Sequence, residues 1–178
     1  ARAELKKRKQ ELLVAASRDT VLANARCAER LKQANMELGL CVGGDDAYQI
    51  LRGLRTMGVR LERHQNNALR LAEWLETDGR VAQVLHPALP SFPGHELWKR
   101  DFCGSSGIFS IVLKENSTKA AFAFLDALEI FGLGYSWGGY ESLAVHVSTA
   151  DRTIAKGNHA GPIIRLQIGL EDAVDLRA

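Results

Sequence analysis

The sequence predicts an α/β fold in which helices cover a small sheet that follows a long helix. Three observations predict it. Apolar residues keep a helical spacing from about residue 46 to 77, without a proline to interrupt them. Four strand-like segments follow, and one helix-like segment lies among them. With 178 residues, 46% of them hydrophobic, the chain can bury a core as one domain with an additional arm.

The first half of the chain reads as helical. Residues 2–16 and 25–38 have helical periodicity, and the glycine-rich sequence GLCVGGDD then breaks the pattern. We expect Asp45 or Asp46 to cap the helix that follows. At about 1.5 Å per residue, a helix over 46–77 would be about 45 Å long, which exceeds what a compact domain of this size needs. We therefore expect it to bridge two domains.

The second half alternates strand-like and helix-like segments. A proline-punctuated loop with a short helix, HPALPSFPGHELWKRDF, follows the first strand. Ser117 or Thr118 is suited to cap a later helix over 117–131. The expected strands are 80–87, 107–114, 142–147 and 163–169. This order suits a small sheet covered by helices.

Charge and cysteine content limit the functional classes. The net charge is only +2, and no segment approaches the ~20 apolar residues of a membrane span, so we expect neither a nucleic-acid nor a membrane partner. The basic run at residues 2–9 predicts a solvated helix face, with nucleic-acid contact as the alternative. Cys27, Cys41 and Cys103 form no metal-ligand or disulfide pattern, which favours reduced thiols, a cytoplasmic location and no metal site.

Two features are typical of a ligand site. The loop sequence FGLGYSWGGYESLA combines four glycines with two tyrosines, a tryptophan and two serines, and glycines allow a backbone to approach a ligand closely. In the last strand, alternation places Arg165 on the face opposite Ile164 and Leu166. A guanidinium there fits a carboxylate at two points. The residues alone leave a structural Asp or Glu and an anionic ligand as alternatives.

Other reactive side chains have structural interpretations. The histidines have no nucleophile at a suitable spacing, the first two tryptophans fit packing positions, and the cysteine beside GSSG fits a plain turn. These residues are His64, His86, His95, His146, His159, Trp74, Trp98 and Cys103.

Four segments carry a family resemblance, in this order: DDAYQILRGLRTMGVRLERH, HPALPSFPGHELWKRDFCGSSGIFSIVLK, FGLGYSWGGYESLA and IIRLQIGLED. From about Val21 to Asp172 the chain resembles the pyridoxal-phosphate-dependent enzymes of cysteine and methionine metabolism. The resemblance implies the C-terminal small domain of a fold-type I enzyme, with a small, mainly antiparallel sheet covered by helices and a long bridging helix. Its Ser-Trp-Gly-Gly sequence is similar to the cystathionine beta-lyase group, where gamma-synthases and gamma-lyases usually have leucine in place of Trp137.

The resemblance also implies residue roles. Arg165 would hold the alpha-carboxylate of the substrate, Ser136 would add a hydrogen bond, and Tyr135 and Trp137 would form the pocket wall. The implied cofactor is pyridoxal phosphate. The implied reaction is carbon–sulfur alpha,beta-elimination from an amino acid such as cystathionine, giving homocysteine, pyruvate and ammonia in transsulfuration and methionine biosynthesis. The family members it resembles are homotetramers.

The sequence departs from the family pattern at its start. The motif around the Schiff-base lysine is not recognisable, so no catalytic residue is assigned and we expect the chain alone to be inactive. We expect a divergent basic arm over 1–20, a remnant of the large domain with the bridging helix over 21–77, and a small domain over 78–178 truncated at its last helix. The alternatives are a non-catalytic fragment or interaction module that pairs with full-length relatives, or a related cystathionine gamma-synthase or gamma-lyase.

Overall fold

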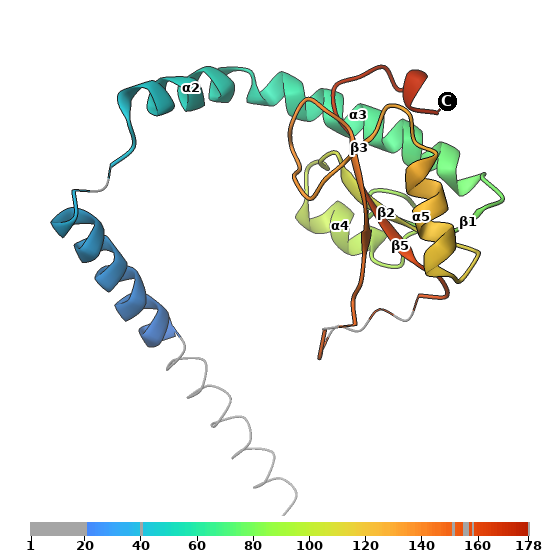
Figure 1. Cartoon of the computed structure of the whole chain (residues 1–178), viewed down its shortest axis with the longest axis horizontal. Helices are drawn as coiled ribbons and strands as arrows, with labels where there is room; N and C mark the ends of the chain where they lie inside the picture. The colour runs from blue at the N-terminus through green and yellow to red at the C-terminus, as the bar shows by residue number, and fades with distance from the viewer. Residues whose placement is uncertain (1–20, 40, 151, 155–156, 158, 178) are drawn as a thin grey trace, which may run out of the picture. The chain divides into compact units, whose positions relative to one another are not determined.

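The computed structural model divides the chain into two compact units, Ala1–Gly53 and Leu54–Ala178 (Figure 1). The helix expected over 2–16 lies outside the described part of the chain. None of the helices that the structure describes is long and apolar enough to cross a membrane. The structure describes residues 21–39, 41–150, 152–154, 157 and 159–177.

The first unit contains a helix over residues 21–37, followed by the start of α2 (Gly44–Arg55). The expectation that Asp45 or Asp46 caps this helix is wrong, because α2 begins one residue earlier and both aspartates lie in its first turn. The amide of Ala47 donates to the carbonyl oxygen of Gly43 at 3.0 Å, which closes that turn. Carboxylates in a first turn still interact favourably with the helix dipole.

Helix α3 (Met57–Glu76) is separate from α2, so the prediction of one continuous helix over 46–77 is wrong. The break lies at Thr56, whose backbone angles of φ −109° and ψ 6° are outside the helical region. Its hydroxyl accepts a hydrogen bond from Arg60 Nε at 3.0 Å, and its carbonyl oxygen accepts one from Arg60 N at 3.1 Å. The backbone bond has the normal i→i−4 spacing of a helix, so the interruption lies in the backbone angles of Thr56, which the spacing of apolar residues does not register.

Five strands form one sheet with the order β1-β2-β5-β4-β3. Every pair is antiparallel except β3–β4, so the prediction of a small, mainly antiparallel sheet is confirmed. The edge strand β1 has a register irregularity between Val81 and Gln83. Strand β3 is only two residues long and was not predicted. The strands are β1 (Val81–Leu85), β2 (Ile108–Leu113), β3 (Gly132–Leu133), β4 (Leu143–Val147) and β5 (Ile163–Gln167).

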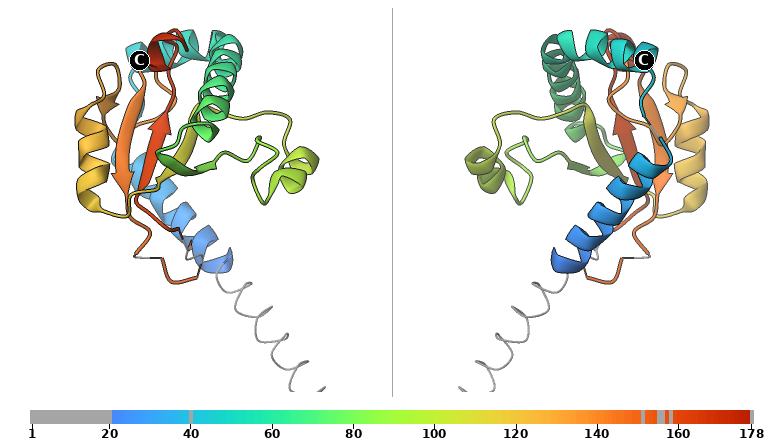
Figure 2. Two further views of the ribbon diagram at one scale, coloured as in Figure 1. Left: turned by 90° about the vertical axis from the view of Figure 1, so that its right-hand side faces the viewer. Right: turned by 90° about the vertical axis from the view of Figure 1, so that its left-hand side faces the viewer.

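Two helices pack on one face of the sheet and enclose the core. Helix α3 contacts β1 and β2, while α5 (Thr118–Asp126) contacts β4 and lies along the sheet in Figure 2. The predicted cap is confirmed: Ser117 Oγ accepts from the amide of Ala120 at 3.1 Å. Helix α5 ends at Asp126, earlier than expected, yet Leu128 still packs against the core. Helix α4 (His95–Asp101) lies in the loop between β1 and β2.

Candidate functional site

Arg165 occupies the middle of β5, the central strand of the sheet. It pairs with Ser110 on β2 and with Val145 on β4. Its neighbours Ile164 and Leu166 are 0% and 3% exposed and face the core below the helices. The predicted alternation is therefore confirmed, and the half-buried arginine lies on the sheet face opposite α3 and α5.

The Arg165 guanidinium is held by the aromatic loop, defined here as residues 134–141. Its Nη2 atom donates to the carbonyl oxygen of Tyr135 at 2.6 Å. Its Cζ atom lies 5.8 Å from the ring centroid of Tyr135 and 5.9 Å from that of Trp137, within cation–π range. Among the described residues, no carboxylate forms an ion pair with Arg165. The sequence left two alternatives for the partner of Arg165. The first, an Asp or Glu of the chain itself, is not found among the described residues.

The aromatic loop is open to solvent. The side chains of Tyr135 and Trp137 are exposed, and Ser136 between them is exposed as well. Gly138 has φ +79°, a conformation that residues with a Cβ atom rarely adopt. The glycine thus allows the turn that places Trp137 over the guanidinium.

A polar cluster behind the loop was missed by the sequence analysis. Ser142 immediately precedes β4, and Glu171 follows β5 by four residues. The amide and the hydroxyl of Ser142 both donate to the Glu171 carboxylate, at 2.6 and 2.9 Å. The side chains of Asn67 and Arg63 on α3 donate to the Glu171 carbonyl oxygen, at 2.8 and 3.0 Å. Polar residues at the ends of two apolar strands are the only sequence signal for this cluster.

The two buried histidines, His64 and His86, each have a partner at Nδ1 but none at Nε2 among the described residues, and the half-buried His95 contacts an aromatic ring. The Nδ1 atom of His64 lies 2.6 Å from the carbonyl oxygen of Ile168. His86 Nδ1 accepts from the amide of Ala88 at 3.2 Å, and burial lowers the pKa of this imidazole. His95 stacks on Trp98 with ring centroids 5.8 Å apart.

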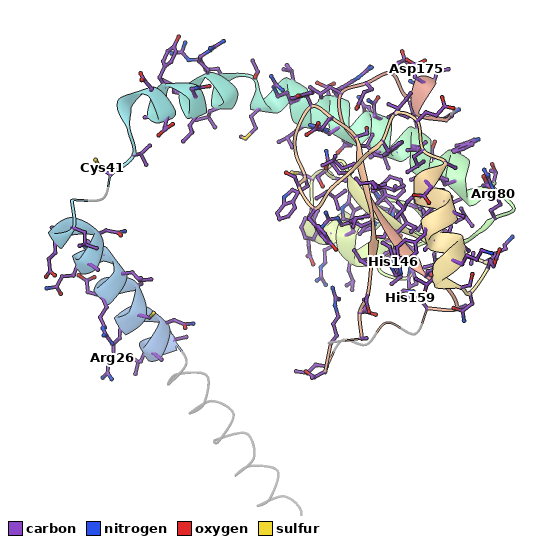
Figure 3. The ribbon with its side chains drawn as sticks, viewed as in Figure 1. Arg26, Cys41, Arg80, His146, His159 and Asp175 are labelled. Carbon is purple, nitrogen blue, oxygen red and sulfur yellow. The ribbon has the colours of Figure 1, made fainter. Side chains whose placement is uncertain are left out.

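Two further histidines line a surface cavity. His146 and His159 border a hollow of about 420 Å³ together with serine and threonine hydroxyls (Figure 3). In the described part of the chain, no group of three or more His, Cys, Asp or Glu side chains is arranged to hold a metal ion. The three cysteines are free and exposed.

The chain belongs to the family of Cys/Met metabolism PLP-dependent enzymes, whose sequence model matches residues 19–178. A relative from Rhizobium johnstonii, assigned to the cystathionine beta-lyases, is 66% identical over 163 residues, which cover 89% of this chain and 41% of the relative. Cystathionine beta-lyase MetC from Escherichia coli is 48% identical over 165 residues, covering 89% and 42%. The chain thus spans about two fifths of the length of these relatives and corresponds to their C-terminal portion.

Solved structures agree with this assignment. The cystathionine gamma synthase of Xanthomonas oryzae pv. oryzae in complex with cystathionine is similar with a TM-score of 0.68 and 40% identity. The similarity covers 79% of this chain and 38% of that chain. The predicted fold, the C-terminal part of a fold-type I PLP-dependent enzyme, is therefore confirmed.

No described lysine is assigned to the attachment of pyridoxal phosphate, the cofactor of this family. Cofactor attachment requires a lysine amine beside the substrate position. Lys32 and Lys99 form ion pairs with glutamates of their own helices, at 3.9 and 3.6 Å. Lys114 follows β2, four residues beyond the partner of Arg165, or about 13 Å along the strand. Lys119 lies on α5, which covers the opposite face of the sheet.

Proposed function

We propose that this chain is the substrate-carboxylate-binding part of a carbon–sulfur lyase of the cystathionine beta-lyase type. The overall reaction is alpha,beta-elimination from cystathionine to homocysteine, pyruvate and ammonia. One observation carries the proposal: a half-buried arginine lies beside two aromatic rings and has only a backbone carbonyl oxygen as its partner among the described residues.

The chemistry of Arg165 fits a carboxylate. A guanidinium carries five N–H donors, and the bond to Tyr135 uses only one nitrogen. The remaining donors can bind both oxygens of an alpha-carboxylate, with the rings of Tyr135 and Trp137 limiting access of water to the pair. We assign Ser136 a further hydrogen bond to the same carboxylate. Fixing the carboxylate fixes the orientation of the amino acid, which accounts for a large part of catalysis in such sites.

The remaining parts of the reaction are not assigned to described residues. Pyridoxal phosphate supplies the electron sink when it is bound, and a base must take the alpha proton. We therefore expect the isolated chain to be inactive. The proposal includes three parts of the chain: a basic arm over 1–20, a remnant of the large domain over 21–77 and the small domain over 78–178.

Oligomerisation and location are also part of the proposal. We expect assembly into an oligomer, with four copies as in the family it resembles. The free thiols of Cys27, Cys41 and Cys103 are suited to a reducing, cytoplasmic compartment.

A binding titration tests the proposal on the chain itself. In isotope-labelled protein, L-cystathionine should produce saturable NMR shifts at the Arg165 Nε–H and Trp137 indole N–H groups. The amine cysteamine, which lacks a carboxylate, should not. Arg165→Ala should weaken binding at least thirtyfold, since loss of a charged two-point contact typically costs about 2–5 kcal/mol. The matched control is Arg80→Ala, an arginine paired with Asp78 in a turn before β1. Equal affinity in the wild type and Arg165→Ala would refute the assignment.

The related alternative is a gamma-synthase or gamma-lyase, and the X. oryzae structure supports keeping it. Trp137 favours the beta-lyase reading. Product analysis of a full-length enzyme that contains this segment distinguishes the two, because pyruvate forms in beta-elimination and 2-oxobutyrate in gamma-elimination.

A further inference from the structure

Ser142 lies at the junction between the aromatic loop and the sheet, and its polar groups all have partners. Its amide donates to Glu171 Oε1 and its hydroxyl to Glu171 Oε2. The same hydroxyl oxygen accepts from the amide of Gly169 at 2.9 Å. Its carbonyl oxygen accepts from the amide of Gly132 at 3.0 Å. Ser142 is 1% exposed, so water does not replace these bonds.

Glu171 connects this junction to helix α3. Its two carboxylate oxygens are both used by Ser142, while its carbonyl oxygen accepts from Asn67 and Arg63. Asn67 is 1% exposed and also donates to the carbonyl oxygen of Gly169 at 3.3 Å. The helix and the end of the loop thus meet at one residue: α3 bonds to the backbone carbonyl oxygen of Glu171, and Ser142 bonds to its carboxylate.

The two chain segments at this point are in very close contact. The amide of Leu170 donates to the carbonyl oxygen of Tyr140 at 2.8 Å. A Cβ atom built on Gly169 would lie 2.3 Å from that same oxygen and 2.4 Å from Glu171 Oε2. Only a glycine fits there, so the end of the aromatic loop is seated on the segment that directly follows β5.

These bonds determine where the loop stands relative to Arg165. The loop lies between β3, which begins at Gly132, and Ser142. Gly132 bonds to Ser142, and Ser142 bonds to the segment after β5. Arg165 belongs to β5, four residues before Gly169. The Tyr135 carbonyl and the Trp137 ring therefore keep their distance from the guanidinium only while the loop ends stay in place.

We propose that Glu171 is a positioning residue: through Ser142 it holds the aromatic loop over Arg165 in the geometry that receives a carboxylate. It does not touch the ligand. The inference rests on the proposed function for the identity of that ligand, but its structural part, loop positioning, holds independently of any ligand.

The test uses Trp137 as the reporter of loop position. The chain has three tryptophans, so Trp74→Phe with Trp98→Phe leaves Trp137 as the only fluorescent one. In this background, Glu171→Ala should increase the fast component of Trp137 fluorescence anisotropy decay and its quenching by acrylamide. Ser142→Ala removes only the hydroxyl bonds and should give a smaller change in the same direction. Glu171→Gln keeps one acceptor for the Ser142 amide and should restore most of the wild-type value. Glu129→Ala, an exposed glutamate between α5 and β3, is the matched control and should change nothing.

The second readout is the affinity for L-cystathionine in the same variants. We expect Glu171→Ala to weaken binding about tenfold, the equivalent of losing one hydrogen bond to a charged group. Thermal melts check that each variant is folded. If Glu171→Ala does not fold, the same comparison is made with Ser142→Ala and Glu171→Gln. A lower melting temperature with unchanged Trp137 mobility would show that Glu171 supports only the fold, and would overturn the inference. Increased mobility in a chain that binds no carboxylate would refute the proposed function and leave the positioning role intact.

Discussion

Arg165 and Tyr135 are thirty residues apart in sequence, yet the Arg165 Nη2 atom donates to the Tyr135 carbonyl oxygen at 2.6 Å. One partner belongs to the central strand of the sheet and the other to an exposed loop. The hydrogen bond therefore joins the centre of the sheet to the aromatic loop. A carboxylate bound by Arg165 would be in contact with the same loop.

Replacing Arg165 with alanine should change stability only slightly. The variant loses one hydrogen bond to a carbonyl oxygen and two cation–π contacts with exposed rings, about 1–2 kcal/mol in total. Urea unfolding of the wild type and Arg165→Ala measures the difference. A loss of about 3–5 kcal/mol would reveal a buried ionic partner and contradict the ligand role.

The glycine pair in the aromatic loop offers a matched test of backbone strain. Gly138 has φ +79°, whereas Gly139 does not have a positive φ, and a Cβ atom would meet nothing within 4 Å at either position. Gly138→Ala should therefore cost about 1–2 kcal/mol or displace the loop, and Gly139→Ala should cost less. Trp137 fluorescence and thermal melts of both variants decide this. Equal effects of the two substitutions would show that strain at Gly138 is unimportant.

The turn before β1 should become less stable in acid. Arg80 donates to the Asp78 carboxylate through Nε and Nη2, and these bonds lower the pKa of Asp78 from 3.8 to about 2. A depressed folded-state pKa stabilises the protein above pH 3.8, and this contribution disappears as the pH falls toward 2. Because the Arg80 side chain is 79% exposed, we expect only about 1 kcal/mol. In Asp78→Asn this acid-dependent part of the unfolding free energy should be missing. If the variant and the wild type lose stability in parallel between pH 4 and 2, the ion pair contributes nothing.

Burial of His86 predicts a second pH effect at a higher range. Desolvation lowers its pKa from 6.5, and the ring is 1% exposed. The unfolded chain gains a proton near pH 6.5 and the folded one only at a lower pH, so stability should fall as the pH drops below 6.5. The slope is at most about 1.4 kcal/mol per pH unit. His86→Asn keeps an acceptor for the Ala88 amide and should remove this slope, whereas the control His159→Asn should retain it. Urea unfolding between pH 5 and 8 makes the comparison, and an unchanged slope in His86→Asn would contradict it.

Helix α2 should exchange its amide hydrogens faster than the C-terminal half of α3. None of its residues is buried, although Tyr48, Ile50 and Leu51 are large and apolar, whereas α3 buries Leu71 and Leu75. A helix without packed side chains has little beyond its own hydrogen bonds to protect it. Hydrogen exchange followed by mass spectrometry compares the two segments. Uniformly slow exchange across both would show that another surface covers α2 in solution.

The alternation of apolar and polar residues predicted most of the strands, because a strand buried on one face has an apolar residue at every second position. The strand around Arg165 and three of the other strands could be read this way, whereas the mainly antiparallel pairing was implied only by the family resemblance. The break at Thr56 could not, since the apolar spacing of α2 continues into α3 while the interruption is made by the backbone angles of a single residue. Strand β3 is too short to show a period.

The candidate site was only partly readable for a similar reason. An arginine among isoleucines and leucines contrasts with its neighbours, and the clustered aromatic residues and glycines are unusual in a plain connection. Glu171 and Ser142, by contrast, are common residue types. Their contact depends on the register of β4 against β5, which places Leu143 opposite Gln167. Such pairings arise from tertiary structure and have no local signal.

The irregular pairing of β1 has a consequence for how the molecule behaves at high concentration. The two outer strands of a sheet carry unpaired backbone groups that can recruit a strand from another molecule and start aggregation. Here one outer strand is distorted between Val81 and Gln83, and the other, β3, offers only two residues. A distorted or very short edge is a poor template for further strands. Neither edge of the sheet therefore favours the addition of a strand from another molecule.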